Sequence, residues 1–251
     1  MSARLHVDPA ECALAAGATL ALPEAAAHHA LRALRMREGD TLVLFDGNGG
    51  EWPATIVSAD RRGATVEIGT HRAIERESPL SVRLAVAVLA TDAMDFAVRK
   101  AVELGVAAID PVVAARSQGA SRADRAEHWR RIVIAACEQC GRNRIPVVAA
   151  PRPLDVWLAS RDGSIPGVVL TPTADTSLAS AANTRVIDVL IGPEGGFEPR
   201  EIDAARRAGL RAVAMGPRVL KAETACVAAL AALQAIAGDW QPVSGGGTAS
   251  A

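Results

Sequence analysis

The feature that most constrains the fold is the alternation of apolar strand-like runs with helical segments from Val82 to Ala237. Short runs rich in valine and isoleucine, separated by longer amphipathic stretches, are typical of strands joined by crossover helices. The pattern predicts an α/β fold in which a parallel sheet carries helices on both faces. The expected strands are Val82–Leu89, Ile109–Val113, Val168–Thr171, Val186–Ile191 and Ala212–Met215, and the expected helices are Asp92–Leu104, Arg125–Cys140, Pro199–Ala208 and Glu223–Ala237.

The N-terminal part of the chain follows a different pattern, with short β-like runs and turns. The segment Asp46–Gly50 is rich in glycine, but it lacks the Lys-Ser/Thr pair and the helix that follow a phosphate-binding loop. We therefore interpret it as a hairpin turn, and we expect a small β-barrel. Its expected elements are the strands Leu42–Phe45, Trp52–Val57 and Ala64–Ile68 and a helix over Glu24–Met36.

A charged, proline-containing stretch from Thr70 to Pro79 separates the two patterns. Domain boundaries commonly fall in such segments. We therefore expect a first domain over residues 1–72, a second over residues 73–240 and a flexible tail over residues 241–251.

The formal net charge of the chain is −1, so no overall basic character indicates a nucleic-acid partner. Between Arg116 and Arg152, however, eight arginines accompany only Asp124, Glu127 and Glu138, a surplus of five positive charges. This block either contacts phosphates or forms a solvated helix face. Hydrophobic residues make up 50% of the chain, which is enough for a core without stabilising disulfides.

The four cysteines are Cys12, Cys137, Cys140 and Cys226. Cys137 and Cys140 form a CxxC pair, but no second pair completes a zinc site, and the pair lies inside an expected helix. We interpret these residues as buried structural thiols and expect no metal. The N-terminus shows no secretion signal, so we expect a cytoplasmic protein with reduced thiols.

The last expected helix is apolar on nearly all sides, because Gln234 is the only polar side chain between Ala225 and Ala237. It is too short to cross a bilayer. Such a helix must be covered all round, either by a symmetric partner subunit or by loops of the same chain. The first alternative predicts a homodimer, and neither alternative involves a membrane.

Two glycine-containing loops carry the strongest chemical signal, IGPEGGF at Ile191–Phe197 and MGPRVLKAETA at Met215–Ala225. Each follows a strand and precedes a helix, at the edge of a parallel sheet where ligands bind. Glycines permit a ligand to approach the backbone closely. Without a Walker lysine or GxGxxG spacing, neither a P-loop nor an ordinary dinucleotide fold is indicated. The first loop is either a ligand loop or a tight structural turn, and a third loop, Leu170–Thr173, follows another strand.

The order of the two loops resembles the cofactor-binding loops of the SPOUT class of methyltransferases. Three further stretches resemble the RsmE-type members of that class, and the similarity extends from Arg4 to Ala237. It implies a C-terminal domain that forms a trefoil knot and binds S-adenosylmethionine, preceded by a PUA-like RNA-binding β-barrel. It also implies methylation of N3 of a uridine in 16S ribosomal RNA of the small subunit. The three stretches are KAVELGV at Lys100–Val106, ACEQCGRNRIP at Ala136–Pro146, and the set formed by Arg4, His29, Arg35 and Phe45-Asp46-Gly47.

The resemblance also implies roles for single residues. Arg218, with the help of Arg142, can stabilise a developing uracil anion, and Glu223 or Glu194 can accept the N3 proton. Each glutamate has an alternative structural role, Glu223 as a favourable charge at a helix start and Glu194 as an acceptor that braces its loop. The implied cofactor-binding residues are Leu170, Thr171, Pro172, Ile191, Gly192, Pro193, Gly195, Gly196, Met215, Gly216, Arg218, Val219, Leu220 and Thr224, and the implied RNA-binding residues are Arg4, His29, Arg32, Arg35, Arg116, Arg142 and Arg144.

The chain departs from the family pattern at two places. Thr91-Asp92 stands where many members have Lys-Gly, and Lys221-Ala222 stands where many have Arg-Thr. The second change can weaken a phosphate contact, since lysine is a point charge without the fork of arginine. Two other functions remain open, a non-catalytic RNA-binding assembly factor and a SPOUT methyltransferase that acts on a ribose 2′-hydroxyl or on tRNA.

Overall fold

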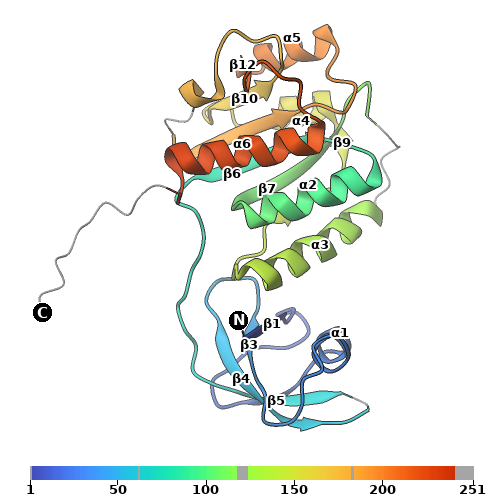
Figure 1. Ribbon diagram of the computed structural model, residues 1–251, viewed down its shortest axis with the longest axis vertical. Helices are drawn as coiled ribbons and strands as arrows, with labels where there is room; N and C mark the ends of the chain where they lie inside the picture. The colour runs from blue at the N-terminus through green and yellow to red at the C-terminus, as the bar shows by residue number, and fades with distance from the viewer. Residues whose placement is uncertain (1, 62, 118–123, 182–183, 241–251) are drawn as a thin grey trace, which may run out of the picture. The chain divides into compact units, whose positions relative to one another are not determined.

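The computed structural model describes the chain except for residues 1, 62, 118–123, 182–183 and 241–251, so the expected C-terminal tail lies outside the described residues (Figure 1). The chain divides into two compact units. The first unit contains the residues up to Glu77 together with Val133–Ile145. The second unit contains Ser78–Ile132 and the residues from Pro146 onward.

The first unit is built on a mixed five-stranded sheet with the strand order β1-β3-β4-β5-β2. Strand β1 runs parallel to β3, and the other neighbours are antiparallel. The expected small β domain is therefore a mixed sheet, and no pairing between β1 and β2 is present among the residues that the structure describes. Its strands are β1 (Ala3–His6), β2 (Thr19–Ala21), β3 (Thr41–Phe45), β4 (Trp52–Ala59) and β5 (Ala64–Ile68).

Alternate residues of these strands form the core of the first unit. Leu42 and Leu44 on β3 are buried, as are Val66 and Ile68 on β5, which is the period-2 pattern of a sheet with one covered face. Strand β4 contains a bulge at Val57, where the pairing shifts between Ile56 and Ser58.

The helix expected over Glu24–Met36 is shorter and less regular than predicted. It consists of α1 (Glu24–His28) followed by a single π-helical stretch, η1 (His29–Ala33). The backbone then turns at Arg35, whose φ of 56° lies in the left-handed region, and the Met36 amide donates to the Ala30 carbonyl oxygen at 3.0 Å. A left-handed residue commonly ends a helix, but glycine or asparagine usually occupies that place. Arg35 is the only such non-glycine residue in the described part of the chain.

The second unit is a parallel sheet with the order β12-β10-β11-β6-β7-β8, in which β9 also pairs with β7. Every strand and helix expected from Val82 onward is present, with bounds that differ by at most three residues. The elements that the sequence did not predict are short, with too few residues to show a period. The elements from Ser78 onward are β6 (Ser81–Ala87), α2 (Thr91–Glu103), β7 (Val106–Val113), α3 (Asp124–Cys140), β8 (Val147–Val148), β9 (Arg152–Pro153), α4 (Leu154–Ser160), β10 (Gly167–Leu170), the 3-10 turn η2 (Leu178–Ala181), β11 (Val186–Ile191), α5 (Pro199–Arg207), β12 (Leu210–Val213) and α6 (Ala222–Ala237). Helix α3 is divided between the units, because its residues from Val133 onward belong to the first one.

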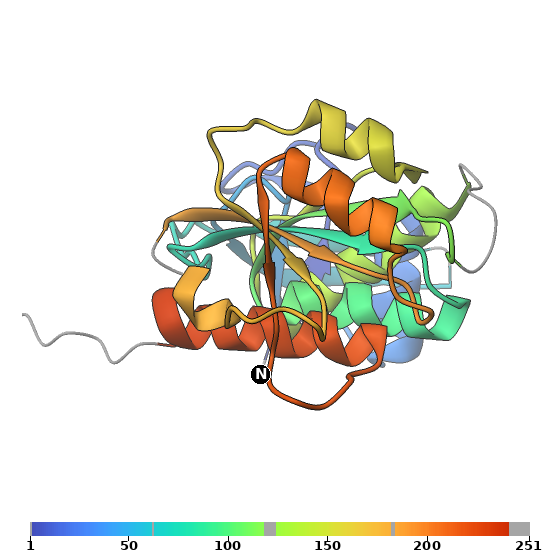
Figure 2. The same cartoon turned by 90° about the horizontal axis from the view of Figure 1, so that it is seen from above.

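Helices cover both faces of this sheet, which confirms the predicted α/β fold. Helices α2 and α6 pack against each other on one face, and α4 and α5 pack together on the other (Figure 2). Among the described residues, no helix combines the length and the apolarity needed to span a bilayer. The trefoil knot stays a prediction, because strand order and pairing alone do not define how the chain is threaded.

The cysteines follow the expectation in part. Cys137 and Cys226 are buried, and burial raises the pKa of each thiol to about 12. Cys12 and Cys140 are half-buried. All four are free thiols.

A buried ion cluster lies at the centre of the second unit. Asp188 on β11 is fully buried, and its carboxylate accepts from Arg83 Nε at 2.5 Å and from Arg161 Nε at 2.8 Å. Arg161 also donates to the carbonyl oxygens of Ile165, at 3.0 Å, and Ala208, at 2.7 Å. The hydrogen bonds to Asp188 raise the pKa of Arg83. One carboxylate therefore links β6, β11 and the segments that flank β10 and β12.

We expect Asp188→Ala to lower the free energy of unfolding by about 3–5 kcal/mol, because it leaves two guanidinium groups without their counter-charge. Urea denaturation followed by tryptophan fluorescence measures this change. Asp203 is a suitable control, since its ion pair with Arg206 is exposed on both sides, and Asp203→Ala is expected to change stability by no more than about 0.5 kcal/mol. Equal losses in the two variants would contradict the role given to Asp188.

Candidate functional site

The main cleft of the second unit lies at the carboxyl ends of β10, β11 and β12. Parallel strands bring these ends to one edge of the sheet, which is where α/β proteins bind ligands. The cleft has a volume of about 620 Å³, within the usual range for small-molecule sites. Its walls are three loops, one face of α5 and the first turn of α6, formed by Leu170–Thr173, Ile191–Phe197, Pro199, Ile202, Asp203, Arg206, Val213, Met215, Gly216, Arg218–Leu220, Ala222 and Ala225.

The loop after β11 has a conformation that depends on its glycines. A Cβ atom on Gly192 would lie 3.0 Å from the ring of Phe197, so the close packing of that ring requires glycine. Gly196 has a φ of 69°, and its amide donates to the Pro193 carbonyl oxygen at 2.8 Å. No atom lies within 4 Å of the place where a Gly196 Cβ would stand, so the cleft is open beside this residue.

Two neighbouring segments brace the same loop. Glu194 Oε1 accepts from the Ala90 amide at 3.0 Å, just before α2. Arg116 Nη1 donates to the Gly195 carbonyl oxygen at 2.9 Å, and the Arg116 side chain lies 3.3 Å from the place of a Gly195 Cβ. Glu194 therefore makes the bracing contact that was its structural alternative, and Arg116 braces the loop too, while its RNA contact stays a prediction.

The loop after β12 is much less constrained. Gly216 has a φ of 79°, Arg218 is exposed, and Val219 is 80% exposed. Within the described part of the chain, the Arg218 side chain has no hydrogen-bond or ion-pair partner. A guanidinium group with unused donors thus stands at the rim of the cleft.

The structure brings together most of the residues implied in cofactor binding and catalysis. Every residue expected to bind the cofactor lines the cleft except Thr224, and Arg218 and Glu194 line it as well. Glu223 does not line the cleft. Successive residues of a helix point about 100° apart, so Ala222 and Ala225 face the cleft while Glu223 and Thr224 between them turn away. Glu223 keeps its alternative role, an acidic residue in the first turn of α6.

Helix α5 contributes wall residues that the sequence analysis missed. Ile202, Asp203 and Arg206 line the cleft from this helix, which begins directly after the IGPEGGF loop. They follow Pro199 by three, four and seven residues, which puts them on one helix face. That periodicity was available in the sequence and could have identified them.

Two arginines expected to contact RNA are buried in ion pairs of the first unit. The Arg4 side chain is 8% exposed, and its Nη1 lies 2.7 Å from Glu51 Oε2, while Nη2 donates to Asn143. Arg142 is paired with Glu77, and its side chain is 5% exposed. Burial would raise the pKa of Glu51, but hydrogen bonds from Arg4, Arg76 and Asn143 hold it below its ordinary value. Both guanidinium groups are thus held by carboxylates of the chain itself, and the predicted RNA contacts of Arg4 and Arg142 and the action of Arg142 on the uracil stay predictions.

The ACEQCGRNRIP stretch therefore serves the first unit as a structural element. Glu138 accepts from the His6 amide at 3.0 Å, and burial raises the pKa of its carboxyl group. Arg144 lies 3.3 Å from Glu75 in a more exposed pair. The stretch thus ties residues 133–145 to β1 and to the segment that follows β5.

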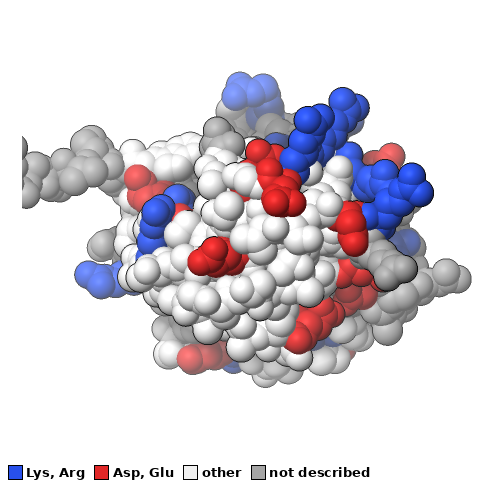
Figure 3. Space-filling model, turned by 90° about the horizontal axis from the view of Figure 1, so that it is seen from below, with Lys and Arg blue, Asp and Glu red and all other residues white. Residues whose placement is uncertain are grey.

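His29, Arg32 and Arg35 remain exposed, as an RNA contact requires. Figure 3 shows the lower end of Figure 1, where Lys and Arg side chains gather toward one side and much of the face carries no charge. A local cationic area on a nearly neutral chain is sufficient for phosphate contacts.

Comparison with known protein families agrees with this arrangement. Residues 76–234 match the model of an RNA methyltransferase domain, and residues 22–69 match the model of an RNA methyltransferase PUA domain. The chain is 30% identical to the ribosomal RNA small subunit methyltransferase E of Buchnera aphidicola subsp. Schizaphis graminum, over 88% of this chain and 92% of that protein. It is 31% identical to the protein of the same name from Synechocystis, over 94% of this chain and 78% of the relative.

Solved structures show the same similarity. The ribosomal RNA small subunit methyltransferase E of Neisseria gonorrhoeae, bound to S-adenosylmethionine, superposes with a TM-score of 0.90 at 34% identity, over 96% of this chain and all (100%) of that one. A protein of Legionella pneumophila, solved in complex with the bound cofactor S-adenosylmethionine, gives a TM-score of 0.90 at 34% identity, over 95% of this chain and 99% of that one. The cleft, the two domain models and the near full-length similarity lead to one conclusion: the chain belongs to the RsmE family of ribosomal RNA small subunit methyltransferases, which join a PUA domain to a SPOUT-type methyltransferase domain.

Proposed function

We propose that this protein transfers the methyl group of S-adenosylmethionine to N3 of a uridine in 16S ribosomal RNA of the small subunit, in the cytoplasm. The observation that carries the proposal is the cleft, whose walls are the same loops that resemble the cofactor loops of the family. The names of the relatives support small-subunit RNA as the substrate, and the bound S-adenosylmethionine in two similar structures supports the cofactor.

The residues of the cleft fit such a cofactor. Ile191, Val213 and Leu220 provide apolar wall for an adenine ring, and the open space beside Gly196 and Gly216 leaves room at the backbone. Backbone groups and apolar walls with a few polar side chains are the usual composition of a cofactor site. When bound, S-adenosylmethionine supplies an electrophilic methyl group on its sulfonium sulfur.

Arg218 is the residue best placed to act on the uracil. N3 carries a proton whose pKa lies well above neutrality. Methyl transfer releases this proton to solvent at the open cleft, and the nucleophilic form of the uracil is an anion that needs stabilisation. Arg218 lines the cleft and keeps its donors unused within the described residues, whereas Glu194 already accepts from Ala90. We therefore assign charge stabilisation to Arg218 and loop bracing to Glu194 and Arg116.

We also propose that the protein is a homodimer that associates through α6. The buried residues of α6, among them Leu230 and Leu233, face the chain's own interior. The other face carries no charged side chain from Val227 to Ile236 and is only partly covered. It includes Val227, Ala228, Ala231 and Ile236, the last 41% exposed. A second copy of the same face can cover it around a twofold axis.

Cofactor binding is tested with Gly196→Val against Gly209→Val. Both glycines have positive φ, 69° and 86°, and both have open space around the missing Cβ, so the strain of valine, about 1–3 kcal/mol, is similar. Only Gly196 lines the cleft. We expect Gly196→Val to weaken binding of S-adenosylmethionine at least tenfold in calorimetry. We expect Gly209→Val to bind S-adenosylmethionine with the affinity of the wild type. Equal affinity of the two variants would remove the loop from the cofactor site.

The role of Arg218 is tested by single-turnover methyl transfer with RNA and cofactor both saturating. A group that stabilises the developing charge acts mainly in the transition state, so Arg218→Ala is expected to lower this rate by about 100-fold. Arg200, an exposed arginine of α5 outside the cleft lining, is the control, and Arg200→Ala should keep the wild-type rate. Mass spectrometry of the product nucleoside identifies the methylated atom, and methylation of a ribose would refute the uridine N3 assignment.

The proposed dimer is tested with Ala231→Glu, which places a charge on the partly covered face of α6. We expect the wild type to sediment as a dimer at micromolar concentration and the variant as a monomer with unchanged circular dichroism. Ala159→Glu, on an exposed position of α4, is the matched control and should remain dimeric. A wild type that is monomeric and active contradicts the proposal. Leu230 is unsuitable for this test, because it is fully buried within the chain itself.

A further inference from the structure

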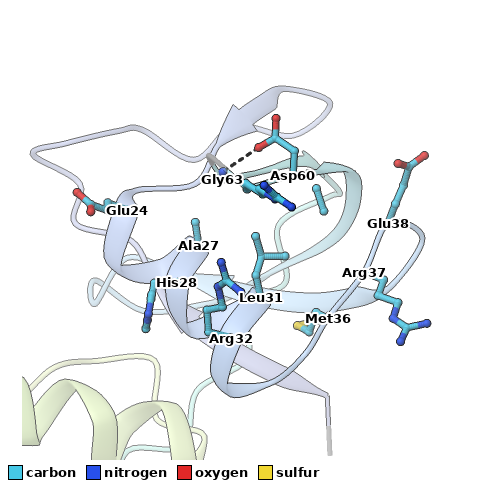
Figure 4. Close-up of a pocket in the computed structure, with 12 residues that line it drawn as sticks. Glu24, Ala27, His28, Leu31, Arg32, Met36, Arg37, Glu38, Asp60 and Gly63 are labelled. Carbon is cyan, nitrogen blue, oxygen red and sulfur yellow. Dashed lines mark hydrogen bonds between the residues drawn. The ribbon is translucent and has the colours of Figure 1, made fainter.

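The first unit contains a cavity of its own, with a volume of about 520 Å³. It lies between α1 with η1 on one side and the β4–β5 hairpin on the other (Figure 4). The loops of the methyltransferase cleft contribute nothing to it. The lining residues are Glu24, Ala27, His28, Leu31, Arg32, Met36–Glu38, Ala59–Arg61 and Gly63.

The lining of this cavity combines apolar side chains with three arginines, Arg32, Arg37 and Arg61, and Arg32 is the one that lies among the apolar side chains. Ala27 is buried, and Leu31 and Met36 are half-buried. Figure 4 shows the Arg32 guanidinium group extending between Ala27 and Leu31. In the described part of the chain, Arg32 has no hydrogen-bond or ion-pair partner. A planar cation beside apolar side chains offers a surface for a flat aromatic ring.

The carboxylates of the lining do not neutralise Arg32. Glu24 and Glu38 point away from the centre of the cavity, and Asp60 Oδ1 accepts from the Gly63 amide at 3.0 Å (Figure 4). Arg37 also points outward and adds positive charge at the rim. A suitable ligand is therefore flat and apolar in its middle and negatively charged at its edge, which describes a nucleobase with its phosphate.

The backbone around the cavity is kept in two uncommon conformations. The π-helical stretch η1 supplies Leu31 and Arg32, and the left-handed Arg35 follows directly before Met36. π-Helical turns occur often at functional sites, and a left-handed non-glycine residue costs about 1–3 kcal/mol. Both irregularities fall in the segment that forms one wall of the cavity.

We propose that this cavity receives one unstacked nucleotide of the RNA substrate. The base stacks on the guanidinium plane of Arg32 and contacts Leu31 and Met36, and the adjoining phosphate lies near Arg37 at the rim. Proteins commonly recognise single-stranded RNA by stacking splayed bases on aromatic side chains or on arginine planes. The proposal rests on the proposed function only in taking RNA as the substrate.

The test compares two single-stranded RNAs of equal length, one with bases throughout and one with abasic ribose units in its middle. Binding is measured by fluorescence anisotropy without cofactor, so no methyl transfer is involved. We expect the wild type to prefer the base-bearing RNA by about tenfold or more, as one stacked base contributes in other proteins. The Arg32→Ala variant should bind the base-bearing RNA about tenfold more weakly than the wild type does, and its affinity for the abasic RNA should change little.

Two further variants separate stacking from charge. Arg32→Lys keeps the charge but not the plane, so it should fail to restore the preference. Arg37→Ala should weaken the binding of both RNAs equally. It should also reduce the slope of the logarithm of the binding constant against the logarithm of the salt concentration by about one, as loss of a phosphate contact does. All variants change exposed side chains, and thermal melting verifies their fold.

Three results would overturn the proposal. The first is an Arg32→Ala variant that binds both RNAs as tightly as the wild type. The second is an Arg32→Ala variant that loses the same affinity for both RNAs. The third is an Arg32→Lys variant that keeps the full preference for the base-bearing RNA. Failure of the proposed function gives a different result. If the protein does not methylate uridine N3, the expected nucleoside is absent in mass spectrometry, but the preference for base-bearing RNA and its dependence on Arg32 are still observed.

Discussion

The buried carboxylate of Asp188 is the constraint on which the geometry of the cleft depends. It lies in β11, the strand that leads into the IGPEGGF loop, and Arg83 and Arg161 neutralise it. Because Arg161 also binds the carbonyl oxygen of Ala208 at the end of α5, the same cluster fixes the strand before the loop and the helix after it. The loop is thus held at both ends by the sheet, and Glu194 and Arg116 brace its middle. Such a loop is ordered before any ligand arrives, which lowers the entropic cost of binding.

The sheet of the second unit and the position of its cleft could be predicted because both follow from local pattern. Apolar runs such as Val186–Ile191 show their strand character without tertiary information, and parallel strands necessarily end at one edge. Side-chain direction was harder to predict. Glu223 is adjacent in sequence to Ala222, which lines the cleft, yet it points elsewhere because of the helical rotation between them.

The roles of the arginines could not be predicted, since each role depends on a partner that is distant in sequence. Arg4 is paired with Glu51 and Asn143, and Arg142 is paired with Glu77. The residues next to each arginine in the sequence do not identify these partners. The resemblance identified these arginines as important without distinguishing a structural ion pair from a contact with RNA. Only burial and partners separate them from Arg32 and Arg218, whose guanidinium groups are unpaired among the described residues. The irregular helix at Glu24–Ala33 was missed for a related reason, because helix propensity carries no information about a π turn.

The left-handed backbone at Arg35 has a consequence for how this protein can change over generations. Glycine would adopt the same conformation without steric conflict, so a single substitution would relieve about 1–3 kcal/mol of strain. Laboratory evolution for heat resistance alone would therefore favour glycine at this position and would remove an exposed cation beside the cavity of the first unit. Thermal stability and surface charge therefore oppose each other at this position, because the substitution that relieves the backbone also removes a cation.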